Sequence, residues 1–146
     1  MLQLENNLQN LDFYIGKWID YPWTRGIHPD DVIHPEEFNK REGKFSIGLA
    51  HCITVENGYL VLKTKNDTFK VKYWDRMSVA LTPEFAWYDE VNEIERPEVR
   101  GIIDKIIWHK KDKEYKYFLI VNGKPKSRRY NPNELQLYRS AGDPAI

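Results

Sequence analysis

The chain has 146 residues, a formal net charge of zero and 41% hydrophobic residues, which fits one globular domain or two very small ones. A charged fraction of 30%, with eight Gly and eight Pro, excludes a collagen-like chain and argues against disorder. No apolar run is long enough to cross a bilayer, and the first ten residues lack the basic and apolar regions of a secretory signal. A single Cys cannot form an internal disulfide, so we expect a cytoplasmic protein with no membrane partner.

Charge is unevenly distributed along the chain. Residues 1–96 carry 11 Lys and Arg against 16 Asp and Glu, a net −5, whereas residues 97–146 carry 11 against 6, a net +5. Such asymmetry is typical of an acidic body with a basic binding face. The simpler interpretation is a dipolar protein whose two halves attract each other.

The N-terminal third contains the predicted helices. Apolar residues recur at helical spacing from Leu4 to Trp18, which predicts a short helix near 3–11. Two His-Pro pairs, at 28–29 and 34–35, are each followed by two carboxylates. Proline and acidic residues favour a helix N-terminus, so we predict a turn near 29–32 and a short helix at 35–41 that ends at Gly43.

From residue 44 the pattern changes to strands. Apolar residues alternate from Phe45 to Ile53, and Asn57-Gly58 predicts a tight hairpin turn because both residues tolerate a positive φ. Further strands are predicted at 59–65, 68–73 and 78–81, before Thr82-Pro83 interrupts the chain.

The same order of elements follows in the second half. We predict a strand at 85–91, a polar loop at 92–98, and a hairpin of strands 101–109 and 115–121 with a charged tip at 110–114. Asn122-Gly123 predicts a second tight turn before a strand at 126–130. A 3₁₀-like turn at 131–135 precedes a last short strand at 136–138.

The two strand sets can be aligned, with Tyr59 on Tyr117, Tyr73 on Tyr130 and Asn66-Asp67 on Asn122-Gly123. This order of elements resembles the SH3-like (Tudor-like, KOW-like) small β-barrel, in which three strands joined by two hairpins are followed by a 3₁₀ turn and a short strand. The resemblance implies a mainly β protein of two SH3-like barrels in tandem, each closed so that no strand edge is exposed. It divides the chain into an N-terminal extension (1–43), barrels at 44–82 and 83–139, and a tail at 140–146. The stretch from Gly101 to Tyr130 is also similar to small uncharacterised bacterial proteins.

Two sets of residues are candidates for catalysis or metal binding. His28 and His34 with their neighbouring acids are possible ligands, but the helix-start interpretation explains each of them. His51 and Cys52 are adjacent on a predicted strand, so they point to opposite faces and cannot form a pair. We therefore predict no catalytic residue, no metal and no cofactor, and we expect that the protein is not an enzyme.

The candidate binding residues lie in the second barrel. Trp108, Tyr117 and Tyr130 fall on neighbouring strands and either form an aromatic groove for a peptide or cationic ligand, or fill the core. Lys124, Lys126 and Arg128 alternate onto one face of the predicted strand, which must meet solvent, acids or a ligand. Arg129 falls on the opposite face, where we expect it to be structural and tied to an acid of the first barrel.

The predicted function is a non-enzymatic protein-interaction module, such as a small regulator or an immunity-type protein, whose partner is another protein or a peptide. The alternative is a nucleic-acid-binding protein that uses the basic second barrel, since lysines interleaved with aromatic residues can grip a phosphate backbone and stack bases.

Overall fold

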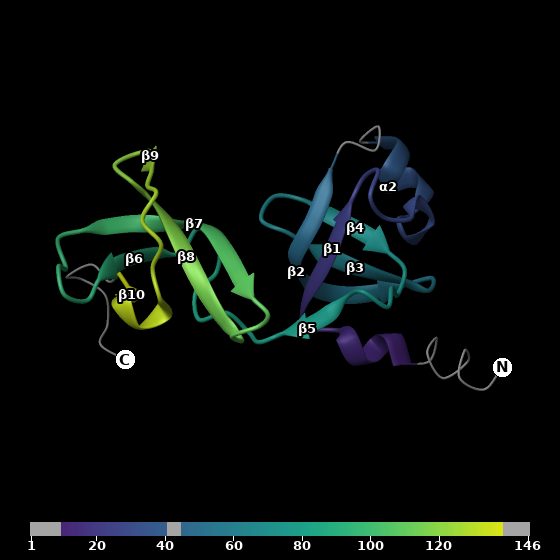
Figure 1. Cartoon of the computed structure of the whole chain (residues 1–146), viewed down its shortest axis with the longest axis horizontal. Helices are drawn as coiled ribbons and strands as arrows, with labels where there is room; N and C mark the ends of the chain where they lie inside the picture. Colours follow the sequence, from purple (N-terminus) through teal and green to yellow (C-terminus); the bar gives the residue numbers. More distant parts are fainter. Residues whose placement is uncertain (1–9, 41–44, 139–146) are drawn as a thin grey trace. The chain divides into compact units, whose positions relative to one another are not determined.

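The computed structural model describes residues 10–40 and 45–138, and it divides the chain into two compact units, residues 1–82 and 83–146 (Figure 1). The helices and strands of the first unit are η1 (Asn10–Tyr14), β1 (Trp18–Thr24), η2 (Asp30–Val32), α2 (Pro35–Lys40), β2 (Ser46–Glu56), β3 (Tyr59–Lys63), β4 (Thr68–Val71) and β5 (Ser78–Ala80). Those of the second are β6 (Glu90–Glu93), β7 (Arg100–His109), β8 (Glu114–Val121), β9 (Lys124–Pro125), η3 (Pro132–Glu134) and β10 (Leu135–Leu137). The chain is therefore mainly β, as predicted.

The first unit contains a five-stranded antiparallel sheet in the order β4-β3-β2-β1-β5. Sequential hairpins join β2, β3 and β4, while β1 lies between β2 and β5. In the register of β1, Ile19 is opposite Ala50 of β2 and Val79 of β5. The last strand of this unit therefore pairs with the first.

Strand β1 was not predicted from the sequence. Its residues Ile19, Tyr21 and Trp23 are completely buried and alternate with more exposed neighbours, which is the period of a half-buried strand. Pro22 and the clustered aromatic residues obscured this alternation. Pro22 is exposed, and the pairing with β2 is irregular between Tyr21 and Thr24, so the sheet accommodates a residue without an N–H at this point.

The second unit repeats this strand order. Its antiparallel sheet runs β10-β6-β7-β8-β9, so its last strand again pairs with its first. The longest pairing joins β7 and β8, from Ile102 opposite Ile120 to His109 opposite Glu114. The register shifts between Ile103 and Lys105, which leaves Asp104 as an extra residue in β7.

Two predicted strands of the second unit are wrong in their limits. The segment predicted as a strand at 85–91 is irregular up to residue 89, and β6 occupies Glu90–Glu93 instead. The predicted loop at 92–98 is thus shorter and starts after Glu93. The predicted strand at 126–130 is absent as well, because β9 ends at Pro125 and only Tyr130 forms an isolated bridge, with Tyr117.

Both predicted Asn-Gly turns are confirmed. Asn57 and Gly58 have φ of 50° and 83°, and Asn122 and Gly123 have φ of 53° and 75°. Two successive positive values define the type I′ turn, whose twist matches that of the flanking strands. The turns set the registers of the β2–β3 and β8–β9 hairpins, where Glu56 lies opposite Tyr59 and Val121 opposite Lys124.

The predicted short helix at 35–41 corresponds to α2, and the predicted turn near 29–32 to the 3₁₀ helix η2. Residue 41 and the predicted helix end at Gly43 lie outside the described residues, as does most of the predicted helix at 3–11. In the neighbouring described segment, Asn10–Tyr14 forms the 3₁₀ helix η1.

The core of the first unit is rich in aromatic side chains. Trp23 stacks on Phe45 at a centroid distance of 4.7 Å, and Phe45 stacks on Phe69 at 5.1 Å. Burial of rings this large supplies much of the stabilisation available to so small a unit. In the second unit, the completely buried apolar side chains include Val91, Ile103 and Leu119.

The order of strands leaves each sheet open. In the first sheet β4 and β5 are the two edges, and in the second β9 and β10 are, so the predicted closure into barrels is not seen among the described residues. β5 and β9 have only three and two residues, and a strand this short offers few groups for pairing across a gap. No helix among the described residues is long and apolar enough to span a membrane.

Candidate functional site beside strand β10

The basic segment predicted as a binding face is only partly in the sheet. β9 pairs with β8 at Lys124 and Pro125, and the chain then continues without regular structure to Tyr130. The prediction that Lys124, Lys126 and Arg128 share one face of a regular strand is therefore wrong. Lys124 and Lys126 are exposed, whereas Arg128 is held by carboxylates. Arg129, predicted to be structural, is exposed.

Arg128 belongs to a cluster centred on Glu93, whose side chain is only 5% exposed. Arg96 binds both carboxylate oxygens of Glu93, through Nε at 2.8 Å and Nη2 at 3.0 Å. Arg128 Nη1 lies 3.4 Å from Oε2, and the Tyr130 hydroxyl donates to the same oxygen at 2.6 Å. Arg128 Nη2 also donates to Glu134 at 3.0 Å. A buried carboxylate with this many donors is compensated in charge and in hydrogen bonding.

This cluster shifts the titration of its members. The hydrogen bond from Arg96 holds the pKa of Glu93 below its ordinary value, with smaller contributions from the Tyr130 hydrogen bond and the charge of Arg128. Burial raises the pKa of Tyr130 to about 12, and its hydrogen bond to the charged Glu93 acts in the same direction. Glu93 is therefore ionised and Tyr130 neutral at physiological pH.

The three aromatic residues predicted for ligand binding occupy different environments. Tyr117 is completely buried, and its hydroxyl accepts hydrogen bonds from the backbone N–H of Glu84 at 3.0 Å and of Phe85 at 3.4 Å. Tyr130 is 4% exposed. Both rings belong to the core of the second unit and offer no face to a ligand. Trp108 is half-buried, with its ring centroid 4.7 Å from that of Tyr115.

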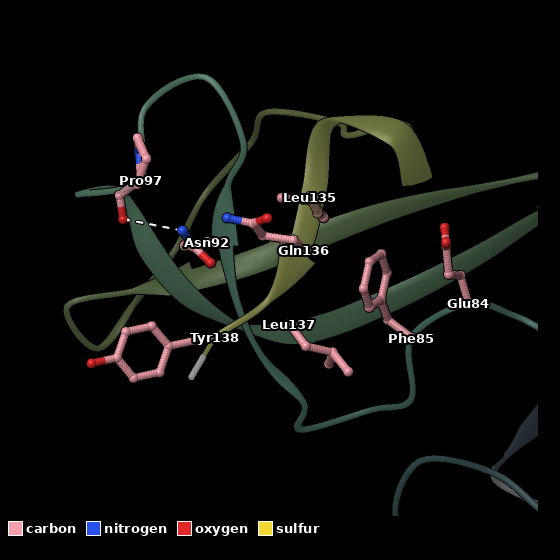
Figure 2. A pocket seen from close by; sticks show the side chains of 8 residues that line it. All are labelled: Glu84, Phe85, Asn92, Pro97, Leu135, Gln136, Leu137 and Tyr138. Carbon is pink, nitrogen blue, oxygen red and sulfur yellow. Dashed lines mark hydrogen bonds between the residues drawn. The ribbon is translucent and has the colours of Figure 1, made fainter. Parts of the chain in front are cut away.

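A hollow with a volume of about 740 Å³ lies beside β10 in the second unit (Figure 2). Phe85 and Leu137 point toward one another at one end, while Asn92 and Gln136 lie together at the other. The Asn92 amide donates to the Pro97 carbonyl at 3.4 Å, which links β6 to the following loop. The complete lining comprises Glu84, Phe85, Asn92, Pro97, Leu135, Gln136, Leu137 and Tyr138.

β10 lines this hollow and is an edge strand, so one of its two backbone edges is not paired with another strand among the described residues. Alternate residues of this segment form hydrogen bonds with β6 and its extension: Tyr138 N–H donates to the carbonyl of Glu90, and Ile94 N–H donates to the carbonyl of Glu134. In an antiparallel pair, the backbone groups of the intervening residues, Leu135 and Leu137, then point away from β6. Leu135 N–H is satisfied by Pro132 at the end of η3. Within the described residues, the N–H and C=O of Leu137 remain available on this edge.

The histidines and the cysteine of the first unit have structural contacts. His28 packs against Trp74 at a centroid distance of 4.8 Å, and His34 against Tyr59 at 4.7 Å. Cys52 is buried, and burial raises the pKa of its thiol. His51 stacks on Trp18 at 5.0 Å instead of facing the thiol. Across residues 10–40 and 45–138, no group of three or more His, Cys, Asp or Glu side chains is arranged to hold a metal ion.

The charge asymmetry of the sequence lies within the second unit. Residues 1–82 carry 10 basic and 11 acidic side chains and residues 83–146 carry 12 and 11, so each unit is close to neutral. Residues 83–100, which include β6, carry six acidic and two basic side chains, whereas residues 101–127 carry three and seven. The second unit thus has an acidic segment beside the hollow and a basic hairpin of β7, β8 and β9.

The hollow and the Glu93 cluster were not predicted from the sequence. Both depend on β6, whose residues Asn92 and Glu93 fell in a segment predicted to be a polar loop. The available signal was Val91-Asn92-Glu93-Ile94, in which two polar residues are flanked by apolar ones. Nothing in such a pattern indicates that an acid is buried, because its partners Arg128 and Tyr130 lie more than 30 residues away.

A model of a family of unknown function, DUF6960, matches residues 11–136, which is most of the chain and spans both units. The chain belongs to this family. No curated protein and no solved structure matches the chain.

Proposed function

We propose that this member of the DUF6960 family is a non-enzymatic protein-interaction module, and that its second unit binds an extended peptide segment beside β10. The observation that carries this function is that β10 is an edge strand with one unpaired backbone edge and that its residues line a hollow of about 740 Å³. A peptide that adds to a sheet edge gains affinity from main-chain hydrogen bonds and specificity from the side-chain hollows beside the strand.

The lining of the hollow favours a peptide of particular composition. Phe85 and Leu137 form an apolar end suited to an aliphatic side chain, and the Asn92 and Gln136 amides can donate to or accept from a polar one. Glu84 also lines the hollow, in a segment with six acidic and two basic residues. Opposite charge steers and selects a partner, so the preferred peptide carries Lys or Arg beside its apolar residues.

In this proposal both units are SH3-like folds arranged in tandem by duplication. Support comes from the shared strand order, in which the last strand pairs with the first and the remaining strands follow as a meander. Support also comes from the turn before each last strand: η3 precedes β10, and Met77 N–H donates to Trp74 in a turn before β5. A fold of this kind positions binding residues without prescribing a function.

The states of the titratable groups agree with a non-enzymatic role. Glu93, the most buried acid described, is ionised and fully engaged by Arg96, Arg128 and Tyr130, so it has no free lone pair directed at a substrate. The raised pKa of the buried Cys52 thiol opposes formation of the thiolate that a nucleophile requires.

Nucleic-acid binding is the second candidate, and the exposed Lys124 and Lys126 within a basic hairpin favour it. Two observations count against it. The charge of Arg128 is already compensated by Glu93 and Glu134. The rings of Tyr117 and Tyr130 are buried, so they cannot stack on bases.

A matched pair of substitutions tests strand addition at β10. Leu137→Pro removes the outward N–H while leaving the hydrogen bonds to β6, because proline is tolerated at an edge position whose N–H faces away from the sheet. Leu137→Ala removes the side chain and keeps the N–H. Affinity capture from the native host, at two salt concentrations with and without nuclease, is expected to recover a protein with the wild type and to lose it with Leu137→Pro.

The comparison of the two variants identifies the mode of binding. Strand addition requires Leu137→Ala to retain more partner than Leu137→Pro, with equal thermal midpoints for both. Equal binding of the partner by wild type and Leu137→Pro would refute it. Captured material that disappears after nuclease treatment and at high salt would support the nucleic-acid alternative instead.

A further inference from the structure

A stripe of apolar side chains lies on the β7–β8 hairpin, on the face opposite the core of the second unit. Ile102 and Ile107 are 38% and 41% exposed, and Phe118 and Ile120 are half-buried. Opposite residues of an antiparallel pair share a face, and Ile102 is opposite Ile120 while Phe118 is opposite Lys105. The alternating residues Ile103, Ile106 and Leu119 are buried on the other face.

On the equivalent face of the first sheet, polar side chains lie around the buried Val61. There β2 and β3 correspond to β7 and β8 in strand order, and Thr54 and Lys70 flank Val61 as its partners in the sheet. Lys63 lies two residues further along β3 on the same face and is exposed. An open antiparallel sheet commonly has one polar, solvated face, so the exposed isoleucines of β7 are not a requirement of this fold. Contiguous exposed apolar residues on a soluble unit mark an interaction surface.

Lysines lie on this face and at the tip of its hairpin. Residues 101–127 contain seven Lys, no Arg and three acids. Lys105 Nζ lies 6.0 Å from the centroid of the Phe118 ring, and Lys116, opposite Ile107, pairs with Glu114 at 3.2 Å. The tip of the hairpin adds the exposed Lys110, Lys111 and Lys113. The face therefore has an apolar centre and a positively charged rim.

We propose that this face, defined by Ile102, Lys105, Ile107, Phe118 and Ile120 and called here the β7–β8 face, docks a protein partner through an acidic surface that contains apolar side chains. Burial of the isoleucines and Phe118 provides the driving force, because desolvated apolar area dominates the energy at the centre of an interface. The lysines place complementary charge at the rim, where it governs the rate and specificity of association. The β7–β8 face is distinct from the β10 edge and does not depend on it.

The composition of the face distinguishes between possible occupants. A second copy of the chain would bring the lysine rim against an identical rim, and like charges across an interface are unfavourable. Surfaces that bind nucleic acid typically present aromatic rings and arginine, but the centre of this face consists of three isoleucines and one phenylalanine. An acidic protein surface satisfies both the apolar centre and the charged rim.

Selection from a random peptide display library on the purified full-length chain tests this surface. Acidic peptides with apolar residues are expected to be enriched on wild type. Their affinity is expected to fall about tenfold or more for Ile107→Ser/Phe118→Ser and for Lys105→Glu. Lys63→Glu, at an exposed side chain of the first unit, is the matched charge-reversal control and is expected to bind as wild type. Thermal midpoints of the variants are expected to stay close to that of wild type.

The assignment would be overturned if no acidic peptide were enriched, or if wild type and the face variants bound the enriched peptides equally well. It would also be overturned if the chain bound an oligo(dT) probe or phosphatidylserine vesicles in place of acidic peptides and the same variants lost that binding. Self-association that Phe118→Ser abolishes would overturn it as well. A large drop in the thermal midpoint of Ile107→Ser/Phe118→Ser would also overturn it, because the stripe would then be covered within the chain. Lys105→Glu, at an exposed site, tests the charged rim even if the double variant does not fold.

Discussion

The hydroxyl of Tyr130 donates a hydrogen bond of 2.6 Å to the carboxylate of Glu93, which lies 37 residues earlier in the chain. Both residues are at most 4% exposed. The bond joins the segment that follows β9 to strand β6, and Arg96 binds the same carboxylate from the loop after β6. Three segments without regular pairing to one another thus meet at one buried charge, which should make this carboxylate important for the stability of the second unit.

Substitution Glu93→Gln tests the role of that charge. The Gln side chain presents an NH₂ group where the carboxylate presented an oxygen to guanidinium and hydroxyl donors, so at least one buried donor loses its acceptor. We expect the free energy of unfolding to fall by about 1–3 kcal/mol, measured by urea denaturation. Glu95→Gln, at an exposed position two residues along, is the control and is expected to change it by less than about 0.5 kcal/mol. Equal midpoints for the two variants would contradict a structural role for Glu93.

The same carboxylate predicts how stability depends on pH. The pKa of Glu93 is lower in the folded protein than its ordinary value of 4.5, chiefly because of the hydrogen bond from Arg96. A group with a depressed folded-state pKa stabilises the fold above its unfolded pKa, and this contribution is lost as the pH falls through the folded-state value. We expect the thermal midpoint of wild type to fall more steeply than that of Glu93→Gln below about pH 4.5. Parallel curves for the two proteins would show that Glu93 has the same pKa in both states.

The Asn-Gly turns predict which substitutions of their glycines lower stability most. Gly58 and Gly123 have positive φ, and an added Cβ would meet no atom within 4 Å at either position, so backbone strain is the main cost of a substitution. Replacement by Val should lower stability by about 1 kcal/mol or more, whereas replacement by Asn should cost less because Asn tolerates positive φ. Thermal melts of the four variants provide the measurement. Val and Asn variants with the same midpoint would argue against strain as the cause.

Local chemistry explains which parts of the fold were predictable from the sequence. Two turns were predictable from Asn57-Gly58 and Asn122-Gly123, because few other residues adopt a positive φ. The strands on either side of these turns were predictable from the alternation of apolar and polar residues. The helix near Pro35 was predictable because proline and two acids fit a helix N-terminus. Strand β1 was not, because Pro22 and the aromatic residues around it conceal an alternation that becomes clear only from burial.

The candidate sites were less predictable because they depend on pairings between distant segments. The free edge of β10 exists only because β10 pairs with β6 and not with its neighbour in sequence, β9. Arg128 seemed available for a ligand when it was placed on a regular strand, but the chain leaves the sheet after Pro125 and carries it to Glu93 and Glu134. The charge asymmetry could be counted from the sequence. Its location inside the second unit became clear only when the structure gave the boundary between the two units.

The contrast between Lys126 and Arg128 yields the last prediction. Their joint reversal to Glu would have left the fold intact if both lay on a solvent-exposed strand face. Arg128 instead lies 3.4 Å from Glu93 and 3.0 Å from Glu134, and its guanidinium is 4.4 Å from the centroid of the Tyr130 ring. Arg128→Glu would place a third carboxylate beside these two, so we expect it to lower the free energy of unfolding by about 1 kcal/mol or more.

Lys126→Glu is the matched control, because it makes the same change of charge two residues away at an exposed side chain. Surface substitutions of this kind change stability by less than about 0.5 kcal/mol. Urea denaturation of the two single variants measures the difference. Raising the salt concentration should reduce the effect of Arg128→Glu only in part, since Glu93 is buried and screening acts mainly on exposed charges. An Arg128→Glu variant as stable as Lys126→Glu would show that the ion pairs of Arg128 contribute nothing to the fold, and Arg128 would again be a candidate for ligand binding.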